Sequence, residues 1–165
     1  MAQEIERKYL LDADVLTAPA LKKYYGKSIQ QAYLSEKGAG MEIRARIAER
    51  DGETKATLTI KTGKGFLRTE FEYPVPVFEA QQLINGCANN VEKTRYDVGR
   101  VELDVYHDNN AGLVVAEIEL TSETEEVEFP AWLRPYVVRE VTGEPAYANA
   151  VLARNLHPTP SSPSI

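Results

Sequence analysis

The sequence predicts an α+β fold, in which an eight-stranded antiparallel sheet closes into a β-barrel with a charged lumen and flanking helices. Apolar and polar residues alternate with a period of two from about residue 3 to residue 122, which is typical of strands with two unlike faces. Glycine-containing turns such as Asp51-Gly52 and Gly63-Lys64-Gly65 suit tight antiparallel connections between these strands. About eight twisted antiparallel strands are enough to close a barrel.

The predicted strands follow one another with short turns between most of them. Their expected bounds are 3–11, 28–36, 40–50, 54–62, 66–76, 90–98, 101–108 and 114–122. Three other stretches lack the alternation and predict helices. The first, 14–25, contains one short helix that Pro19 interrupts, and the second is 78–84. Two more helices are expected in 131–156, where Pro130 and Pro135 suit first-turn positions.

The chain of 165 residues has the length of one domain. We expect a single folded domain over residues 1–156, followed by a flexible C-terminal tail, 157–165, which is rich in proline and serine. Cys87 is the only cysteine, so it has no intramolecular disulfide partner, and no apolar run approaches the ~20 residues of a membrane span. A reducing, cytoplasmic location without a membrane partner is therefore the expectation.

The charge balance limits the kind of partner that the outer surface can bind. The chain has 19 Lys and Arg against 25 Asp and Glu, a net charge of −6. This balance argues against nucleic acid held by a general basic surface. An anionic ligand would require a local concentration of positive charge.

Charged residues occupy the polar faces of the predicted strands in pairs at i and i+2. Arg44 and Arg46 share one face of their strand, for example, while Ile43 and Ile47 take the other. One such strand alone would indicate a solvated face, but seven strands repeat the pattern, some with acidic and others with basic pairs. If the apolar faces pack outward against the helices, the charged faces line the lumen. The lumen would then contain Lys8, Arg44, Arg46, Lys61, Arg68, Lys93, Arg95, Glu4, Glu6, Glu70, Glu72, Glu102, Asp104, Glu117 and Glu119.

A lumen with this many charges must be hydrated or filled by ligands that neutralise it, because burying unpaired charges is costly. Arg and Lys match phosphate oxygens, and clustered carboxylates suit Mg²⁺ or Mn²⁺. A zinc site is not expected, because the chain has one Cys and two His. Together the two charge classes predict a metal–polyphosphate complex, in which the bases hold the phosphates and the acids hold the metal.

Several short motifs lie on these strands. The first, Glu4-Ile5-Glu6-Arg7-Lys8, has the form ExExK. The others are Met41-Glu42-Ile43-Arg44-Ala45-Arg46, Leu58-Thr59-Ile60-Lys61, Val91-Glu92-Lys93-Thr94-Arg95-Tyr96, Glu102-Leu103-Asp104-Val105 and Glu117-Ile118-Glu119. These motifs occur in the order typical of the CYTH superfamily, the triphosphate tunnel metalloenzymes, and the chain resembles that superfamily over roughly residues 2 to 155. Within it, the chain resembles the short bacterial tripolyphosphatase-like members.

The resemblance implies a role for each charged position. The metal ligands would be Glu4, Glu6, Glu117 and Glu119. The phosphate ligands would be Lys8, Arg44, Arg46, Lys61, Arg68, Lys93 and Arg95. Glu70 and Asp104 would support them by orienting the bases or by contacting metal through water. Lys8 and Tyr33 would form the catalytic dyad of the short bacterial members, although a Tyr33 that merely packs at the edge of the lumen is an alternative.

The resemblance further implies an inorganic triphosphatase, which uses Mg²⁺ or Mn²⁺ to hydrolyse tripolyphosphate to pyrophosphate and phosphate. Residues 139–149 resemble the segment that closes one mouth of the tunnel in short members, which would favour a small linear triphosphate. Three alternatives stay open: a class IV adenylate cyclase that converts ATP to cyclic AMP and pyrophosphate, a thiamine triphosphatase, and a non-catalytic polyphosphate-binding module. The expected partner is a small-molecule triphosphate, with no nucleic acid, and a homodimer is also considered.

Overall fold

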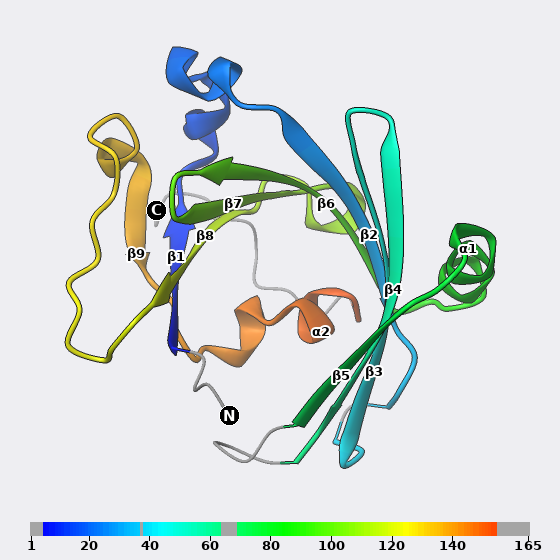
Figure 1. Cartoon of the computed structure of the whole chain (residues 1–165). Coiled ribbons are helices and arrows are strands. Elements are labelled where there is room, and N and C mark those ends of the chain that lie inside the picture. Colours follow the sequence, from blue (N-terminus) through cyan, green and yellow to red (C-terminus); the bar gives the residue numbers. More distant parts are fainter. Residues whose placement is uncertain (1–4, 37, 64–68, 155–165) are drawn as a thin grey trace.

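The computed structural model describes residues 5–36, 38–63 and 69–154, and its main element is one antiparallel sheet of nine strands. The strands are β1 (Ile5–Leu11), β2 (Gly26–Tyr33), β3 (Met41–Arg50), β4 (Glu53–Thr62), β5 (Thr69–Pro74), β6 (Asn90–Val98), β7 (Val101–Tyr106), β8 (Val114–Leu120) and β9 (Val137–Glu140). They lie in the order β5-β4-β3-β2-β6-β7-β8-β1-β9 and curve around an interior (Figure 1). The predicted tail, 157–165, lies outside the described residues.

The first eight strands confirm the alternating segments predicted from the sequence, and β6 has the predicted bounds. The ninth strand, β9, lies where two helices were expected, so the helical prediction was wrong for this part of 131–156. Val137 and Val138 are β-branched and suit a strand. Their pairing partner is β1, with Tyr9 opposite Glu140, and a partner this distant in the sequence leaves no local pattern.

The helices are short. The helix α1 (Val77–Asn85) confirms the prediction for 78–84. The segment 14–25 forms two 3₁₀-helices, η1 (Ala13–Thr17) and η2 (Pro19–Lys23), and Pro19 begins the second. The C-terminal part has η4 (Arg134–Tyr136), η5 (Pro145–Tyr147) and α2 (Asn149–Leu152), while η3 (Asp108–Asn110) lies between β7 and β8. None of the helices in the described ranges has the length and apolar character of a membrane-spanning segment.

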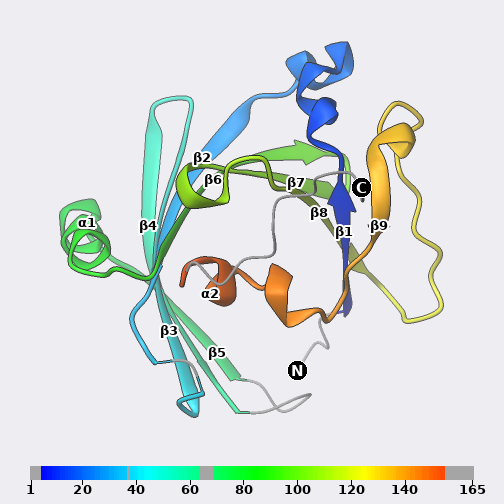
Figure 2. The same ribbon diagram turned by 180° about the vertical axis from the view of Figure 1, so that it is seen from behind.

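The predicted closure of the sheet into a barrel is not confirmed. The two ends of the strand order are β5 and β9, and no strand pairing joins them within the described ranges. Both views place β5 and β9 on opposite sides of the interior (Figures 1 and 2). The edge of β1 that a closed ring would need is already occupied by β9, which leaves a curved sheet with two edges.

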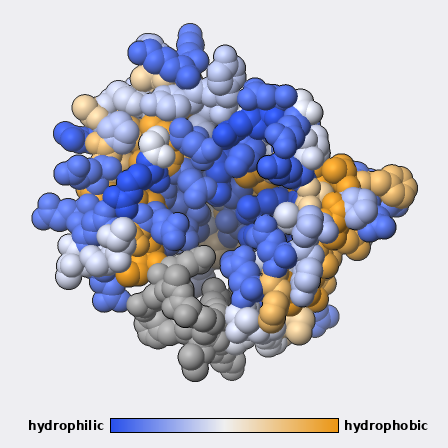
Figure 3. Space-filling model, in the orientation of Figure 1, coloured by the Kyte–Doolittle hydropathy of each residue, from blue (hydrophilic) through white to orange (hydrophobic). Residues whose placement is uncertain are grey.

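The outward faces of most strands are apolar and covered, whereas Phe71 and Tyr73 on the edge strand β5 are exposed. On one side α1 packs on β3 and β4, where Ile84 joins Ala45 in a buried cluster. On the other side η1 and the segment after β8 cover β7, and Val15, Leu103 and Leu133 are buried together. Figure 3 shows hydrophobic residues over α1 at the rim and hydrophilic residues around the hollowed centre of this face. The hydrophobic core of the protein therefore lies largely outside the curve of the sheet.

The inner face of the sheet changes from charged to apolar along the strands. On β1, Glu6 and Lys8 are followed on the same face by Leu10. Leu10 is buried in a cluster with Tyr147 and Leu152, which belong to η5 and α2. Both views show α2 inside the curve of the sheet (Figures 1 and 2). The C-terminal segment thus fills the apolar half of the interior and leaves the charged half open.

We predict that Leu152→Ala destabilises the protein by about 2–5 kcal/mol, because it removes a fully buried side chain that anchors α2 inside the sheet. Denaturant unfolding followed by circular dichroism measures the change. Leu83→Ala is the control, since Leu83 lies on α1 and is 41% exposed. An equally small effect of both substitutions would show that α2 contributes little to the packing.

Candidate active site

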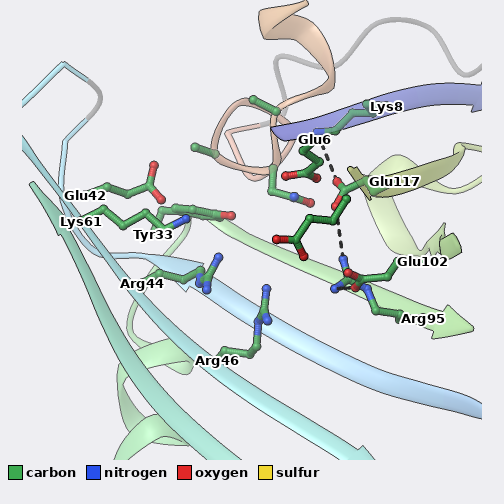
Figure 4. A pocket seen from close by; sticks show the side chains of 14 residues that line it. Glu6, Lys8, Tyr33, Glu42, Arg44, Arg46, Lys61, Arg95, Glu102 and Glu117 are labelled. Carbon is green, nitrogen blue, oxygen red and sulfur yellow. Dashed lines mark ion pairs between the residues drawn. The ribbon is translucent and has the colours of Figure 1, made fainter. Parts of the chain in front are cut away.

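A polar cavity of about 420 Å³ lies between the inner face of the sheet and α2. It is lined by Glu6, Lys8, Tyr33, Glu42, Arg44, Arg46, Lys61, Arg95, Glu102, Glu117, Glu119, Ala148, Asn149 and Ala150. Side chains from both sides of the cavity point toward its centre (Figure 4). Seven strands contribute to this wall, because period-two alternation turns every second residue inward.

Basic side chains from β3 and β4 form one wall. Arg44 and Arg46 share a face of β3, and Lys61 on β4 is the register partner of Glu42. The Nε of Arg44 is buried without a hydrogen-bond partner in the described part of the chain. Burial and the neighbouring Arg44 lower the pKa of Arg46 to about 10. Arg44 and Arg46 repel each other and have no ion-pair partner among the described residues, which suits them to an anionic ligand.

Carboxylates from β1, β7 and β8 form the opposite wall. Lys8 pairs in register with Glu117, and its Nζ lies 3.3 Å from Glu117 Oε1. Partial burial and the neighbouring Glu117 raise the pKa of Glu6 to about 8. The pKa of Glu117 is lowered, because the protonated Glu6 and Lys8 outweigh the effect of its burial. The opposite shifts favour a protonated Glu6 beside an ionised Glu117 near neutral pH.

A buried ion-pair network lies behind this wall. Asp104 Oδ1 accepts a hydrogen bond of 2.7 Å from Arg95 Nε, and its Oδ2 accepts one of 2.6 Å from Lys93 Nζ. Burial alone would raise the pKa of Asp104, but the two cations hold it below the usual range. Glu102 is a further ion-pair partner of Arg95. The network holds the Arg95 guanidinium in the cavity wall.

Lys93 was predicted as a phosphate ligand, but its side chain lies outside the cavity lining. It is 1% exposed and does not line the cavity. Its Nζ also donates to Asn149 Oδ1 on α2 at 3.3 Å, and Tyr106 Oη donates to the same oxygen at 2.6 Å. Burial lowers the pKa of Lys93. Lys93 thus connects the sheet to α2 instead of facing the cavity.

The residues of the predicted dyad line one cavity, but each has partners of its own. Lys8 Nζ donates to the Tyr147 carbonyl at 3.1 Å and is paired with Glu117. Tyr33 is 3% exposed, and its hydroxyl accepts a hydrogen bond of 2.9 Å from Gln31. Burial raises the pKa of Tyr33 to about 12. No hydrogen bond joins Lys8 to Tyr33 within the residues that the structure describes, and Tyr33 stays protonated at neutral pH.

Some predicted residues lie elsewhere. Glu70 and Glu72 are both exposed on the edge strand β5, with Glu70 3.9 Å from Lys61, and neither lines the cavity. Glu4 and Arg68 lie outside the described residues. Glu42 lines the cavity but was not predicted, although its position two residues before Arg44 indicates the same face.

The acidic wall has the donor chemistry of a divalent cation site. The oxygen donors of Glu6, Glu117 and Glu119 suit Mg²⁺ or Mn²⁺. The raised pKa of Glu6 indicates that its neighbours, including Glu117, disfavour a second negative charge, and a bound cation would favour that charge. Over residues 5–36, 38–63 and 69–154, no group of three or more His, Cys, Asp or Glu is gathered tightly enough to hold a metal. A site built on these residues therefore also requires ligands outside this set, such as phosphate oxygens or water.

The sequence is similar to a known protein family and to a curated relative. The model of the CYTH domain matches residues 2–145. The chain is 33% identical over 163 residues to an inorganic triphosphatase of Acetivibrio thermocellus, with 94% of this chain and 96% of the relative covered.

Solved structures show the same similarity. The crystal structure of the inorganic triphosphatase NE1496 is similar with a TM-score of 0.65 and 28% identity, and the match covers 93% of this chain and 95% of that one. The protein PH1819 of Pyrococcus horikoshii OT3 has a TM-score of 0.50 at 21% identity over 73% of this chain and 80% of its own, which supports the fold alone. Because the family model spans most of the chain and the curated relative spans nearly all of it, the chain belongs to the CYTH domain family.

Proposed function

We propose that the protein hydrolyses inorganic tripolyphosphate to pyrophosphate and phosphate with the help of Mg²⁺ or Mn²⁺. The observation that carries this proposal is the cavity itself. Arginines on β3 without ion-pair partners in the described chain face carboxylates on β1 and β8, one of which, Glu6, has a raised pKa. A polyanion and a divalent cation together complement both walls. The two relatives named inorganic triphosphatases support the same activity.

The basic wall binds the substrate in this proposal. Arg44 and Arg46 donate hydrogen bonds to phosphate oxygens, and their planar guanidinium groups suit two oxygens at once. Lys8 has three donors, of which Glu117 and the Tyr147 carbonyl take two, so one is left for the substrate. These cations neutralise the negative charge that moves toward the leaving pyrophosphate as the bond breaks.

The acidic wall binds the metal and orients the attacking water in this proposal. Glu6, Glu117 and Glu119 would hold the metal, which when bound offsets the charge of the phosphates and aligns them. Glu117, ionised because of its lowered pKa, accepts a hydrogen bond from the attacking water. The water oxygen bonds to the terminal phosphorus and gives one proton to Glu117, the other staying on the phosphate; the bridging P–O bond breaks, and pyrophosphate leaves with the bonding electrons. Tyr33 donates a hydrogen bond in this scheme and does not act as the base.

The size of the cavity favours a small substrate. Ala148, Asn149 and Ala150 line it on the side of α2, and Asn149 is tied to Lys93 and Tyr106. This wall leaves about 420 Å³ for the ligand, which suits a short linear triphosphate with its counter-ion. The polar lining of the cavity disfavours ATP, for which a cyclase would also have to bind the base and ribose. A cytoplasmic location and a homodimer stay predictions from the sequence.

We predict that purified protein with Mg²⁺ or Mn²⁺ releases phosphate from tripolyphosphate faster than from ATP or thiamine triphosphate, because the charged lining of the cavity complements the triphosphate and, in the described part of the chain, offers no site for a base or thiamine ring. Phosphate release and cyclic AMP are measured with each metal and substrate, and an EDTA-treated sample is the control. Cyclic AMP from ATP would favour the cyclase. Tight binding of tripolyphosphate without turnover would identify a binding module.

We predict that Arg44→Ala raises KM for tripolyphosphate about 10- to 100-fold, since it removes charge-assisted hydrogen bonds to phosphate. Steady-state kinetics measure the change. Arg50→Ala is the matched control, because Arg50 lies on the same strand but pairs with Asp97, away from the cavity. Equal KM values for the two variants would place the phosphate site elsewhere.

We predict that the affinity for Mn²⁺ rises with pH up to about 8, by up to tenfold per pH unit, and changes little above it. Glu6 has a pKa of about 8, so below that pH the cation must displace its proton, whereas above it the carboxylate is already ionised. Isothermal titration calorimetry from pH 6 to 9 measures the affinity. Glu6→Gln should bind more weakly and lose this dependence, whereas the exposed Glu79→Gln should behave as wild type. A pH-independent affinity for the wild type would argue against Glu6 as a ligand.

A further inference from the structure

Gln31 on β2 connects two residues of the cavity wall without lining the cavity itself. Its side chain is fully buried, with 0% exposure. Its Oε1 accepts a hydrogen bond of 2.9 Å from Arg46 Nε, and its Nε2 donates one of 2.9 Å to Tyr33 Oη. The signal in the sequence was the position of Gln31, two residues before Tyr33 on the same face, but nothing in the sequence indicated its two partners.

The chemistry of the partners determines the orientation of the Gln31 amide. Arg46 Nε can only donate, so the Gln31 atom that faces it must be the carbonyl oxygen. The NH₂ group then faces Tyr33, and the Tyr33 oxygen must accept. The reverse orientation would place two donors against each other at Arg46. Gln31 therefore has one orientation that satisfies both neighbours.

This arrangement determines where the Tyr33 proton can go. The oxygen of Tyr33 already accepts from Gln31, and the nearby guanidinium groups of Arg44 and Arg46 offer only further donors. No hydrogen bond from the Tyr33 hydroxyl to an acceptor occurs in the described ranges of the chain. The hydroxyl proton is free for an acceptor in the cavity, toward which Tyr33 is directed (Figure 4).

Gln31 has a second effect, on Arg46. With Nε bound to Gln31, the two terminal Nη groups of Arg46 are left for the cavity that the side chain lines. Two parallel N–H groups are the geometry that binds a phosphate group through two oxygens. Holding a long side chain in this position before the ligand arrives reduces the conformational entropy that binding would otherwise lose.

We infer that Gln31 is a positioning residue for the proposed triphosphatase reaction, which keeps Tyr33 as a hydrogen-bond donor to the substrate and directs the Nη groups of Arg46 at a phosphate. The inference rests on the proposed function, because it assigns these two donors to the triphosphate. Gln31 acts through its neighbours and makes no contact with the ligand. Its contribution is to preorganise donors whose directions would otherwise vary.

Substitution by Glu separates the two effects. In Gln31→Glu the carboxylate still accepts from Arg46, but it also accepts the Tyr33 hydroxyl proton, which then turns away from the cavity. We expect kcat/KM for tripolyphosphate to fall roughly tenfold, as for the loss of one hydrogen bond to a charged group. We expect Tyr33→Phe to cause a similar fall, and the double variant Gln31→Glu/Tyr33→Phe to fall no further.

Gln31→Met removes both hydrogen bonds at similar size. It should lower kcat/KM more than Tyr33→Phe does and also raise KM roughly tenfold, because Arg46 is released as well. A purely structural role would instead reduce the active fraction and leave KM unchanged in every variant. Should Gln31→Glu fail to fold, as judged by thermal unfolding, the comparison of Gln31→Met with Tyr33→Phe carries the test.

The control is Gln30→Met, the neighbouring glutamine on the outer face, whose side chain meets Gln81 of α1 at 3.4 Å. It should retain wild-type kinetics. Wild-type kcat/KM in Gln31→Glu, or a roughly hundredfold fall in the double variant, would overturn the role of Gln31. Inactive wild-type protein would contradict the proposed function alone. The affinity of the same variants for tripolyphosphate is then measured by calorimetry. Gln31→Glu and Tyr33→Phe should each weaken binding, and the double variant should weaken it no further.

Discussion

The buried carboxylate of Asp104 is the interaction on which the rest of the site depends. It accepts hydrogen bonds from Arg95 and Lys93, and so neutralises two cations that burial would otherwise make costly. Through Arg95 it holds a guanidinium in the cavity wall, and through Lys93 it reaches Asn149 on α2. One residue on β7 thereby links the sheet, the cavity and the C-terminal segment that closes it.

The charges around the cavity are arranged so that a ligand completes them. Arg44 and Arg46 repel each other on one wall, and the proximity of Glu117 raises the pKa of Glu6 on the other. The two walls do not simply neutralise each other, because each has charge that its own neighbours leave unbalanced. A metal–polyphosphate complex would reduce the repulsion between the arginines and the repulsion between the carboxylates at once. The same electrostatic change would therefore favour both binding and catalysis.

Much of the fold and of the candidate site could be predicted from alternation alone. Period-two patterning located eight strands and correctly turned residues such as Arg44 and Glu117 toward one interior. It did not reveal β9, whose pairing with β1 joins distant parts of the chain, nor the two edges that leave the sheet open. Alternation placed Lys93 on the inner face, and the family resemblance added it to the phosphate ligands, but the alternation of residues along a strand gives the face of a side chain and not how deeply it is buried.

The sequence by itself determined which side chains share the inner face, because each strand repeats with a period of two whatever surrounds it. Only the tertiary structure decided what each of them does there. Lys93 became an internal partner of Asp104 because α2 enters the apolar half of the interior and covers it. The role of Gln31 also depended on the structure, because only the register of β2 and β3 places Arg46 opposite Gln31, while Tyr33 follows two residues later on the same face of β2.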